Sequence, residues 1–176
     1  MSLRDIVPTD KEIVMREDEF IVSKTDLKGK ITYGNKTFIE FSGFEEHEVL
    51  GVQHNVIRHP DMPRGVFKLL WGHIQEGKEI FAYVKNICKN GSFYWVLANV
   101  TPSVDQFGKV VGYYSVRRKP NPRAIPVISE LYRQMLDIEK KTGTRDAIAA
   151  STQLLEKTLR EKGLSYEQFV LSLQAA

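Results

Sequence analysis

The sequence predicts an α+β domain with one five-stranded antiparallel sheet, followed by helices. Three observations support this fold class. Runs of β-branched and aromatic residues typical of strands lie on both sides of a helical middle segment, at residues 20–22, 30–33, 80–89, 92–103 and 109–118. The pair Asn90-Gly91, a strong hairpin signal, joins two of these runs. After Pro120 the pattern is helical only, so the order of elements favours a sheet with helices on one face and further helices at the C-terminus.

Charge and cysteine content exclude several classes of protein. The 176 residues carry a formal net charge of +3, with no basic arm that would favour a nucleic-acid partner. The single cysteine, Cys88, excludes an intramolecular disulfide and a multi-thiolate metal site, and it is compatible with a reducing compartment. No apolar run approaches the ~20 residues of a membrane span. We therefore expect a cytoplasmic protein with no nucleic-acid partner and no direct membrane insertion.

The chain is expected to divide into three regions. Residues 1–18 are polar and lack sustained periodicity, so they predict a flexible N-terminal lead-in. Residues 19–119 hold the predicted strands and the helices between them. Residues 120–176 form a C-terminal helical region that starts at a stiff joint, Pro120-Asn-Pro122.

Helices are predicted between the second and third strands. Asn35 opens a short helix over residues 36–42, which Gly43 ends as a C-cap. A second short helical segment follows at residues 45–50. A longer helix over residues 64–75 carries a core-facing stripe at i, i+3, i+4 and i+7, formed by Phe67, Leu70, Trp71 and Ile74.

Three more helices are predicted after the joint. Apolar residues recur at helical spacing up to Gly143, then up to Gly163, and again up to Leu173. Ser165 and Gln168 form a capping-box pattern at the start of the last helix. These helices are expected to pack back on the sheet, to pair in a homodimer or to form an output surface for a partner, and these possibilities are compatible.

Chemically active side chains concentrate in one segment, His54-Asn-Val-Ile-Arg-His-Pro-Asp-Met-Pro63. Its two prolines restrict the backbone and keep the segment out of a regular helix. Arg58, His59 and Asp61 beside apolar neighbours predict the wall of a pocket. The alternative is a surface loop in which Arg58 and Asp61 merely pair with each other.

This segment is also where the chain resembles a known family. Residues 19–119 are similar in element order and length to a PAS domain and, within that family, to the PAS domain of Aer-type aerotaxis receptors. The shared positions are Asn35, Ser42-Gly-Phe44, His54 to Pro63, Phe67, Trp71, Val84-Lys-Asn86, Tyr94 to Pro102 and Gly112 to Arg117. The run from Arg58 to Pro63 is specific, whereas the PAS pattern as a whole is diffuse.

The resemblance implies a function and a cofactor. Domains of this type bind FAD non-covalently and report redox, oxygen or energy state to the chemotaxis machinery. A chain of this size resembles more closely the stand-alone CetB type, which acts on a separate membrane-bound transducer. The implied partners are a chemotaxis transducer or another signalling protein, and a second copy of the chain in a homodimer.

The resemblance also implies which side chains surround or support the flavin: Asn35, Arg58, His59, Asp61, Phe67, Trp71 and Asn86. An isoalloxazine ring has an aromatic face, an apolar edge and a polar edge, so its pocket needs aromatic walls and a few placed donors and acceptors. The guanidinium of Arg58 suits a phosphate or a negatively charged ring. Structural alternatives are a helix N-cap for Asn35 and ordinary core packing for Phe67 and Trp71.

One stretch departs from the aerotaxis pattern. Where that pattern has a Trp, a small residue and a Gly at the start of the third strand, this chain has Ile80-Phe-Ala82. We expect the pocket wall to differ there. Phe81 replaces the missing ring only if the strand register turns it inward.

Three other functions are compatible with parts of the sequence. A photosensing flavin domain that forms a cysteinyl adduct needs a thiol where this chain has His54-Asn55, whereas Cys88 is expected on a strand. A haem-binding PAS gas sensor would use His54, His59 or His73 as axial ligand, with His59 the strongest candidate. A cofactor-free PAS interaction module would use its helices for dimerisation. Neither a catalytic triad nor a phosphate-binding loop is visible, so we expect no enzymatic activity.

Overall fold

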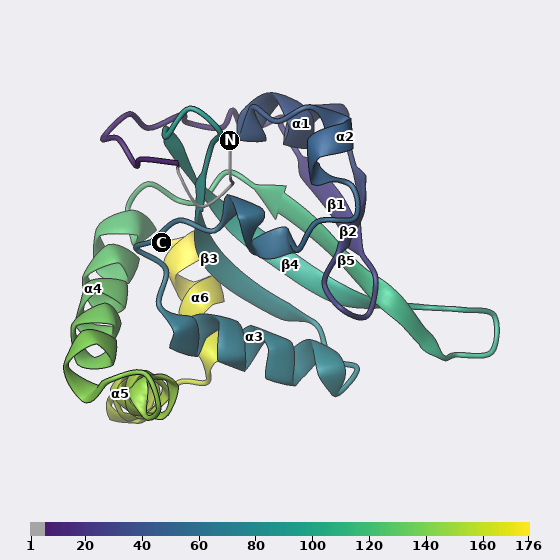
Figure 1. Cartoon of the computed structure of the whole chain (residues 1–176). Coiled ribbons are helices and arrows are strands. Elements are labelled where there is room, and N and C mark those ends of the chain that lie inside the picture. Colours follow the sequence, from purple (N-terminus) through teal and green to yellow (C-terminus); the bar gives the residue numbers. More distant parts are fainter. Residues whose placement is uncertain (1–5) are drawn as a thin grey trace.

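The computed structural model describes residues 6–176, and in them the sheet has the strand order β2-β1-β5-β4-β3 (Figure 1). Its strands are β1 (Ile21–Thr25), β2 (Ile31–Gly34), β3 (Ile80–Ile87), β4 (Phe93–Val104) and β5 (Val110–Arg118). Each neighbouring pair is antiparallel. The predicted fold class is therefore confirmed.

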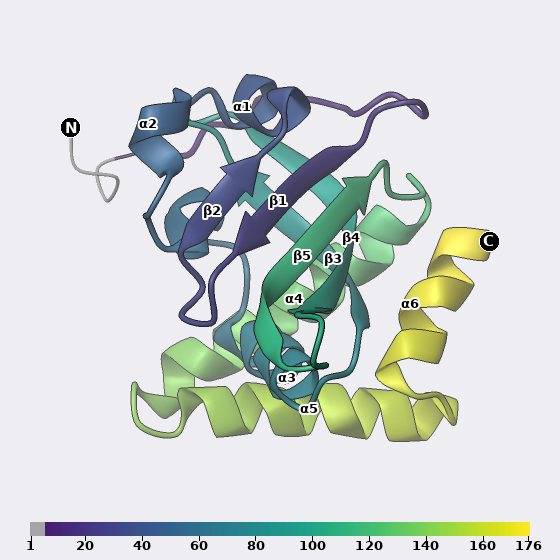
Figure 2. The ribbon, with the colours of Figure 1, turned by 90° about the vertical axis from the view of Figure 1, so that its right-hand side faces the viewer.

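The helices also lie close to their predicted positions. Between β2 and β3 the chain forms α1 (Lys36–Ser42), α2 (Glu46–Val49), the short 3₁₀ helix η1 (His54–Ile57) and α3 (Arg64–Gln75). After β5 it forms α4 (Ala124–Thr142), α5 (Ala147–Lys162) and α6 (Tyr166–Ala175). Figure 2 shows α5 crossing below α3, with α6 rising beside the sheet. None of the helices in the described part of the chain is long and apolar enough to span a membrane.

The strand register decides which side chains face α3. In β3, Val84 and Asn86 lie on the face towards α3, so Tyr83 and Lys85 point the other way because strand side chains alternate. Tyr83 meets the C-terminal helices: its hydroxyl donates to Oε1 of Gln174 (3.0 Å), and its carbonyl accepts from the hydroxyl of Tyr132 (2.7 Å). The helices α4 and α6 therefore pack against β3, the strand at one edge of the sheet.

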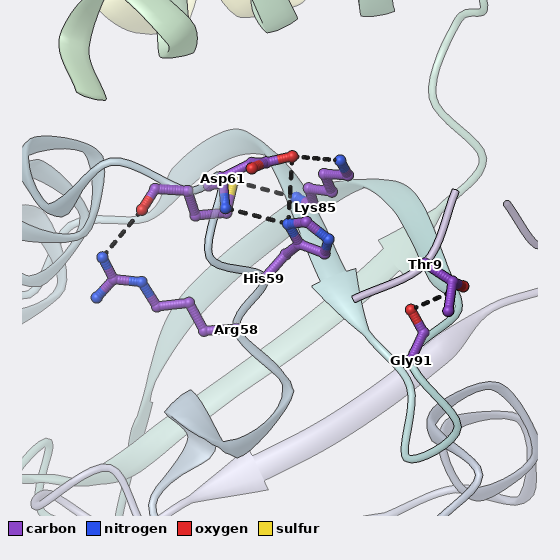
Figure 3. Close-up of polar contacts among 7 residues, drawn as sticks. Thr9, Arg58, His59, Asp61, Lys85 and Gly91 are labelled. Atoms are coloured by element: carbon purple, nitrogen blue, oxygen red, sulfur yellow. Dashed lines mark hydrogen bonds and ion pairs between the residues drawn. The ribbon is translucent and has the colours of Figure 1, made fainter. Parts of the chain in front are cut away.

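The N-terminal stretch is attached to the β3–β4 hairpin. The backbone N–H of Thr9 donates to the carbonyl of Gly91 (2.9 Å), and Phe93 exchanges backbone hydrogen bonds with Lys11 (2.9 Å) and Ile13 (2.8 Å). Figure 3 shows the contact between Thr9 and Gly91. The expected flexible lead-in, of which residues 1–5 lie outside the described part, stays a prediction. The boundaries after residues 18 and 119 stay predictions too.

The joint before α4 is held by the end of α6. The backbone N–H of Asn121 donates to Oε1 of Gln174 (2.9 Å), and the Asn121 side chain donates to the carbonyl of Leu173 (3.2 Å). The Gln174 amide donates in turn to the carbonyl of Lys119 (3.4 Å). The last helix thus returns to the point where the chain leaves the sheet.

Asn35 joins the first helix to the first strand. Its Oδ1 accepts from the backbone N–H of Phe38 (2.9 Å), which makes it the N-cap of α1, and from that of Val22 (3.0 Å). Its Nδ2 donates to the carbonyl of Phe20 (2.9 Å). All three bonds join Asn35 to backbone groups of the protein, and the bond to Phe38 confirms the N-cap interpretation of Asn35.

We expect Asn35→Ala to lower the free energy of unfolding by about 1–3 kcal/mol, because it removes a helix cap and two further bonds to backbone groups. Asn35→Asp retains the Oδ1 acceptor and loses only the donor, so its loss should be smaller. Urea denaturation of the three proteins measures the difference. An alanine variant as stable as the wild type would show that the three bonds contribute nothing.

Candidate functional site

A cavity of about 400 Å³ lies between α3, η1 and the facing side of the sheet; we call it the α3 pocket. This volume falls in the range of ~300–1,000 Å³ that is usual for small-molecule sites. The strands that line it are β1, β3, β4 and β5. The pocket therefore lies on the sheet face that the central helix covers.

The wall contributed by α3 is aromatic. Phe67 and Trp71 line the pocket from successive turns of the helix. The Trp71 ring meets Tyr113 of β5 edge-on, with ring centroids 5.5 Å apart and an interplanar angle of 89°. Gly29 lies against the same indole: its φ is +79°, and a Cβ there would come within 3.0 Å of the Trp71 ring. Gly29 thus gives the tryptophan the space it occupies.

The opposite end of the α3 pocket is polar and buried. Arg117 of β5 is 2% exposed, and its Nη2 donates to the hydroxyl of Ser23. Within the described residues its Nε and Nη1 have no hydrogen-bond partner. The guanidinium lies over the Phe38 ring, 5.3 Å from its centroid. Burial lowers the pKa of Arg117 to about 10, so the group stays charged at neutral pH.

His54 belongs to the same polar end. Its Nε2 lies 3.0 Å from the Ser23 hydroxyl. Burial, and then the positive charge of Arg117, lower the pKa of His54 to about 3. The imidazole is therefore neutral at physiological pH, and it places a neutral polar ring beside a permanent positive charge.

Arg58 and Asn86 enter the α3 pocket side by side. Arg58 forms an isolated antiparallel bridge with Asn86 of β3, so the two side chains lie on one face. The Arg58 guanidinium lies over the Phe67 ring (4.5 Å to the centroid) and donates to the carbonyl of Met62 (3.0 Å). Asn86 is 3% exposed, and its Nδ2 has no partner among residues 6–176. A ligand would find an unused amide donor here.

The same bridge turns His59 and Asp61 away from the pocket. Residues next to each other in an extended segment point to opposite sides, and His59 follows Arg58. The His59 ring packs edge-on against Phe93 (5.8 Å between centroids). The Asp61 carboxylate pairs with Lys85 Nζ (2.6 Å), as Figure 3 shows. The backbone N–H of Asp61 donates to Nδ1 of His59 (3.0 Å). This group stiffens the loop behind Arg58.

The structure thus brings together four of the seven residues expected around a ligand. Arg58, Phe67, Trp71 and Asn86 line the α3 pocket, whereas Asn35, His59 and Asp61 do not. The surface-loop alternative for Arg58 and Asp61 is wrong, because each has a different partner. Phe81 does not line the pocket either, since it pairs with Asn99 on the strand positions that point away from it.

Several lining residues were not expected as flavin contacts. They include Ser23, His54, Tyr113, Arg117 and Ile148. The sequence held one signal for them. Tyr113, Ser115 and Arg117 alternate along β5, so a charged residue falls on the inward side of a strand, where an apolar one is usual.

Of the side chains on which the other candidate functions depend, only His54 lines the α3 pocket among the described residues. Cys88 is buried just after β3 and does not line the α3 pocket; burial raises the pKa of its thiol to about 11. His59, the favoured haem ligand, also lies outside the pocket. His73 has its Nδ1 3.0 Å from the carbonyl of Leu69. Among the described residues that line the pocket, His54 is the only histidine.

Comparison with known sequences gives a family and two relatives. The family profile described as "PAS fold" matches residues 31–117. The aerotaxis receptor of Escherichia coli (strain K12) is 38% identical over 127 residues, which are 72% of this chain and 25% of the receptor. The bacterioopsin transcriptional activator of Halobacterium salinarum is 27% identical over 93 residues, 53% of this chain and 14% of that protein. The chain thus spans a quarter or less of these relatives.

Solved structures share the fold. A light-oxygen-voltage domain studied with a flavin analogue has a TM-score of 0.52 and 21% identity, covering 70% of this chain and 87% of that one. The blue-light activated histidine kinase of Erythrobacter litoralis EL346 has a TM-score of 0.54 and 20% identity, covering 75% of this chain and 42% of the kinase. At this level of identity the similarity is one of fold.

The neutral state of His54, which is partly buried, predicts a pH dependence of stability. In the unfolded chain His54 binds a proton below its ordinary pKa of 6.5, whereas in the folded chain it does so only near 3. The unfolded state therefore binds more protons between these two pH values. The stability that neutral His54 contributes to the folded chain is lost as the pH falls from 6.5 towards 3.

We expect the free energy of unfolding to fall more steeply between pH 6 and 5 in the wild type than in His54→Gln, by up to about 1.4 kcal/mol per pH unit. Denaturant titrations at several pH values measure the slopes, and His47→Gln, at an exposed position, is the matched control. Equal slopes in the wild type and His54→Gln would contradict the neutral state of His54.

Proposed function

From the match of residues 31–117 to the PAS family, we propose that the α3 pocket binds a flavin, FAD, non-covalently. We propose further that the chain is a non-enzymatic sensor of redox, oxygen or energy state. The observation that carries this proposal is the pairing of an aromatic wall with buried donors that lack partners within the described chain. Asn86 Nδ2 and two nitrogens of Arg117 are such donors. Leaving buried polar groups unsatisfied costs stability, so a bound acceptor is the natural completion of the site.

The chemistry of the walls fits an isoalloxazine ring. Phe67, Trp71 and Tyr113 offer aromatic surface for the ring, and Val84, Ala98 and Val100 offer apolar surface for its hydrocarbon edge. The carbonyls and nitrogens of the pyrimidine edge would accept from Asn86 or Arg117. A bound flavin would supply reversible uptake of electrons.

Charge also favours this ligand. The lining of the α3 pocket contains Arg58, Arg64, Lys68 and Arg117, and the described lining contains no Asp or Glu. Permanent cations favour a ligand that carries phosphate groups or that gains negative charge. Arg117, buried beside neutral His54, would stabilise negative charge on whatever part of the ligand reaches the polar end.

We expect Arg58→Ala and Asn86→Ala, made separately, to weaken flavin binding by about 5- to 150-fold while the protein stays folded, since removing a partner from a buried polar contact costs ~1–3 kcal/mol. Binding is followed by flavin absorbance after gel filtration, and folding by circular dichroism. Arg118→Ala and Asn99→Ala are matched controls, because neither residue lines the pocket. Full flavin occupancy in both pocket variants would remove the support for this site.

We also propose that the chain signals through a protein partner, a chemotaxis transducer. The similarity to an aerotaxis receptor supports this, as does the presence of three helices after the PAS domain. Co-purification of the chain with the cytoplasmic region of such a transducer, in oxidising and in reducing buffer, tests it. Absence of complex in both buffers would leave the transducer without support. Homodimerisation stays a prediction from the sequence.

One observation favours a second candidate, a haem-binding sensor. His54 presents an imidazole to the α3 pocket and stays neutral at physiological pH, which is the state that binds iron. Against this candidate, Nε2 of His54 already lies within hydrogen-bonding distance of Ser23. His54→Ala would abolish haem binding, whereas a flavin site would retain its other donors.

A further inference from the structure

A buried carboxylate joins the C-terminal helices to the helix that forms the pocket wall. Glu139 of α4 is 8% exposed. Its Oε2 accepts from the backbone N–H of Arg64 (3.1 Å), and its Oε1 from that of Gly65 (3.0 Å). The same Oε1 accepts from the hydroxyl of Ser151 on α5 (2.6 Å). One side chain of α4 therefore contacts two other helices, α3 and α5.

The N-terminus of α3 needs a partner that its own sequence does not supply. Its N-cap is Pro63, which makes no side-chain cap bond, so the first N–H groups of the helix require an acceptor from elsewhere. Glu139 supplies it from a position 75 residues further along the chain than Arg64. A negative charge at a helix N-terminus is also favoured by the helix dipole.

The close packing of this contact depends on Gly65. A Cβ at Gly65 would lie 2.3 Å from the Ser151 hydroxyl, 3.2 Å from Met135 Cε and 3.2 Å from the backbone nitrogen of Thr152. The first turn of α3 is thus pressed against both α4 and α5. Figure 2 shows α5 beneath α3.

The helix turns that follow Glu139's contact belong to the α3 pocket. Six residues of α3 line the pocket: Arg64, Phe67, Lys68, Leu70, Trp71 and Ile74. Ile148 of α5 lines it too. The C-terminal helices therefore contribute one lining residue directly and contact, through Glu139, the first turn of the helix that carries these six.

We propose that Glu139 is a positioning residue of the α3 pocket, and that ligand binding in the pocket and docking of α4 and α5 onto α3 are thermodynamically coupled through it. Coupling of this kind is reciprocal: if docked helices tighten ligand binding, the bound ligand stabilises the docked helices by the same factor. This inference rests on the proposed flavin site. It identifies the contact by which a change in the pocket reaches the C-terminal helices.

The test compares the wild-type chain of 176 residues with Glu139→Gln, which retains the shape of the side chain and removes its charge. FAD affinity is measured by fluorescence titration, and amide hydrogen exchange over residues 124–162 is measured with and without FAD. In the wild type, FAD should slow exchange in α4 and α5. In Glu139→Gln we expect FAD affinity to fall about tenfold, in line with loss of a charge-assisted contact, and most of this FAD-dependent protection to disappear.

Two further variants keep the test decisive. Glu130→Gln lies on α4 at an exposed position, paired with Arg133, and should leave both readouts unchanged. Ser151→Ala removes one donor to the carboxylate and should give a smaller effect in the same direction, which decides the matter if Glu139→Gln does not fold.

The possible results separate this inference from the proposed function. A wild-type chain that binds no flavin overturns the proposed function and the coupling that rests on it. Flavin binding of equal strength in the wild type, Glu139→Gln and Ser151→Ala, with no FAD-dependent protection of α4 and α5, overturns the coupling alone.

Discussion

The burial of Arg117 on the inward side of β5 is the constraint on which the interpretation of the pocket depends. Desolvating a guanidinium is costly unless it is paired and hydrogen-bonded. Within the described chain, Ser23 and the Phe38 ring compensate only part of that cost, since two nitrogens lack partners. Desolvation, and then this charge, lower the pKa of His54 and keep it neutral. Such a group at the end of an aromatic cavity favours a ligand with acceptor atoms or negative charge, which supports the proposed site.

The second constraint is the position of α3, which provides most of the aromatic wall. Its C-terminal turns pack over the sheet through its apolar stripe, whereas its first turn is held by Glu139 from α4. The pocket is thus completed by a part of the chain outside the segment that matches the PAS family. The α6 contacts with Lys119 and Asn121 tie the far end of the helical region to the exit of β5. The C-terminal helices therefore contact both the helix that forms the pocket wall and the chain just after β5.

Much of the fold was predictable, because local signals decide it. The Asn90-Gly91 hairpin and the Asn35 cap act over a few residues, and the structure contains both. The site was predictable only in part. The antiparallel bridge between Arg58 and Asn86 decides that Arg58 faces the pocket and His59 does not. These two residues lie far apart in the sequence, so no pattern of neighbouring residues predicts that they pair. The contact of Glu139 with α3 is of the same long-range kind.

Identifying what the purified 176-residue chain carries decides whether the α3 pocket is a flavin site. We expect a yellow protein with the structured blue absorption of an oxidised flavin, which releases FAD on denaturation, or an apoprotein that takes up added FAD stoichiometrically. An intense Soret band would contradict the flavin site in favour of haem. A colourless protein that binds neither cofactor would contradict it in favour of a PAS module that acts only by protein contact.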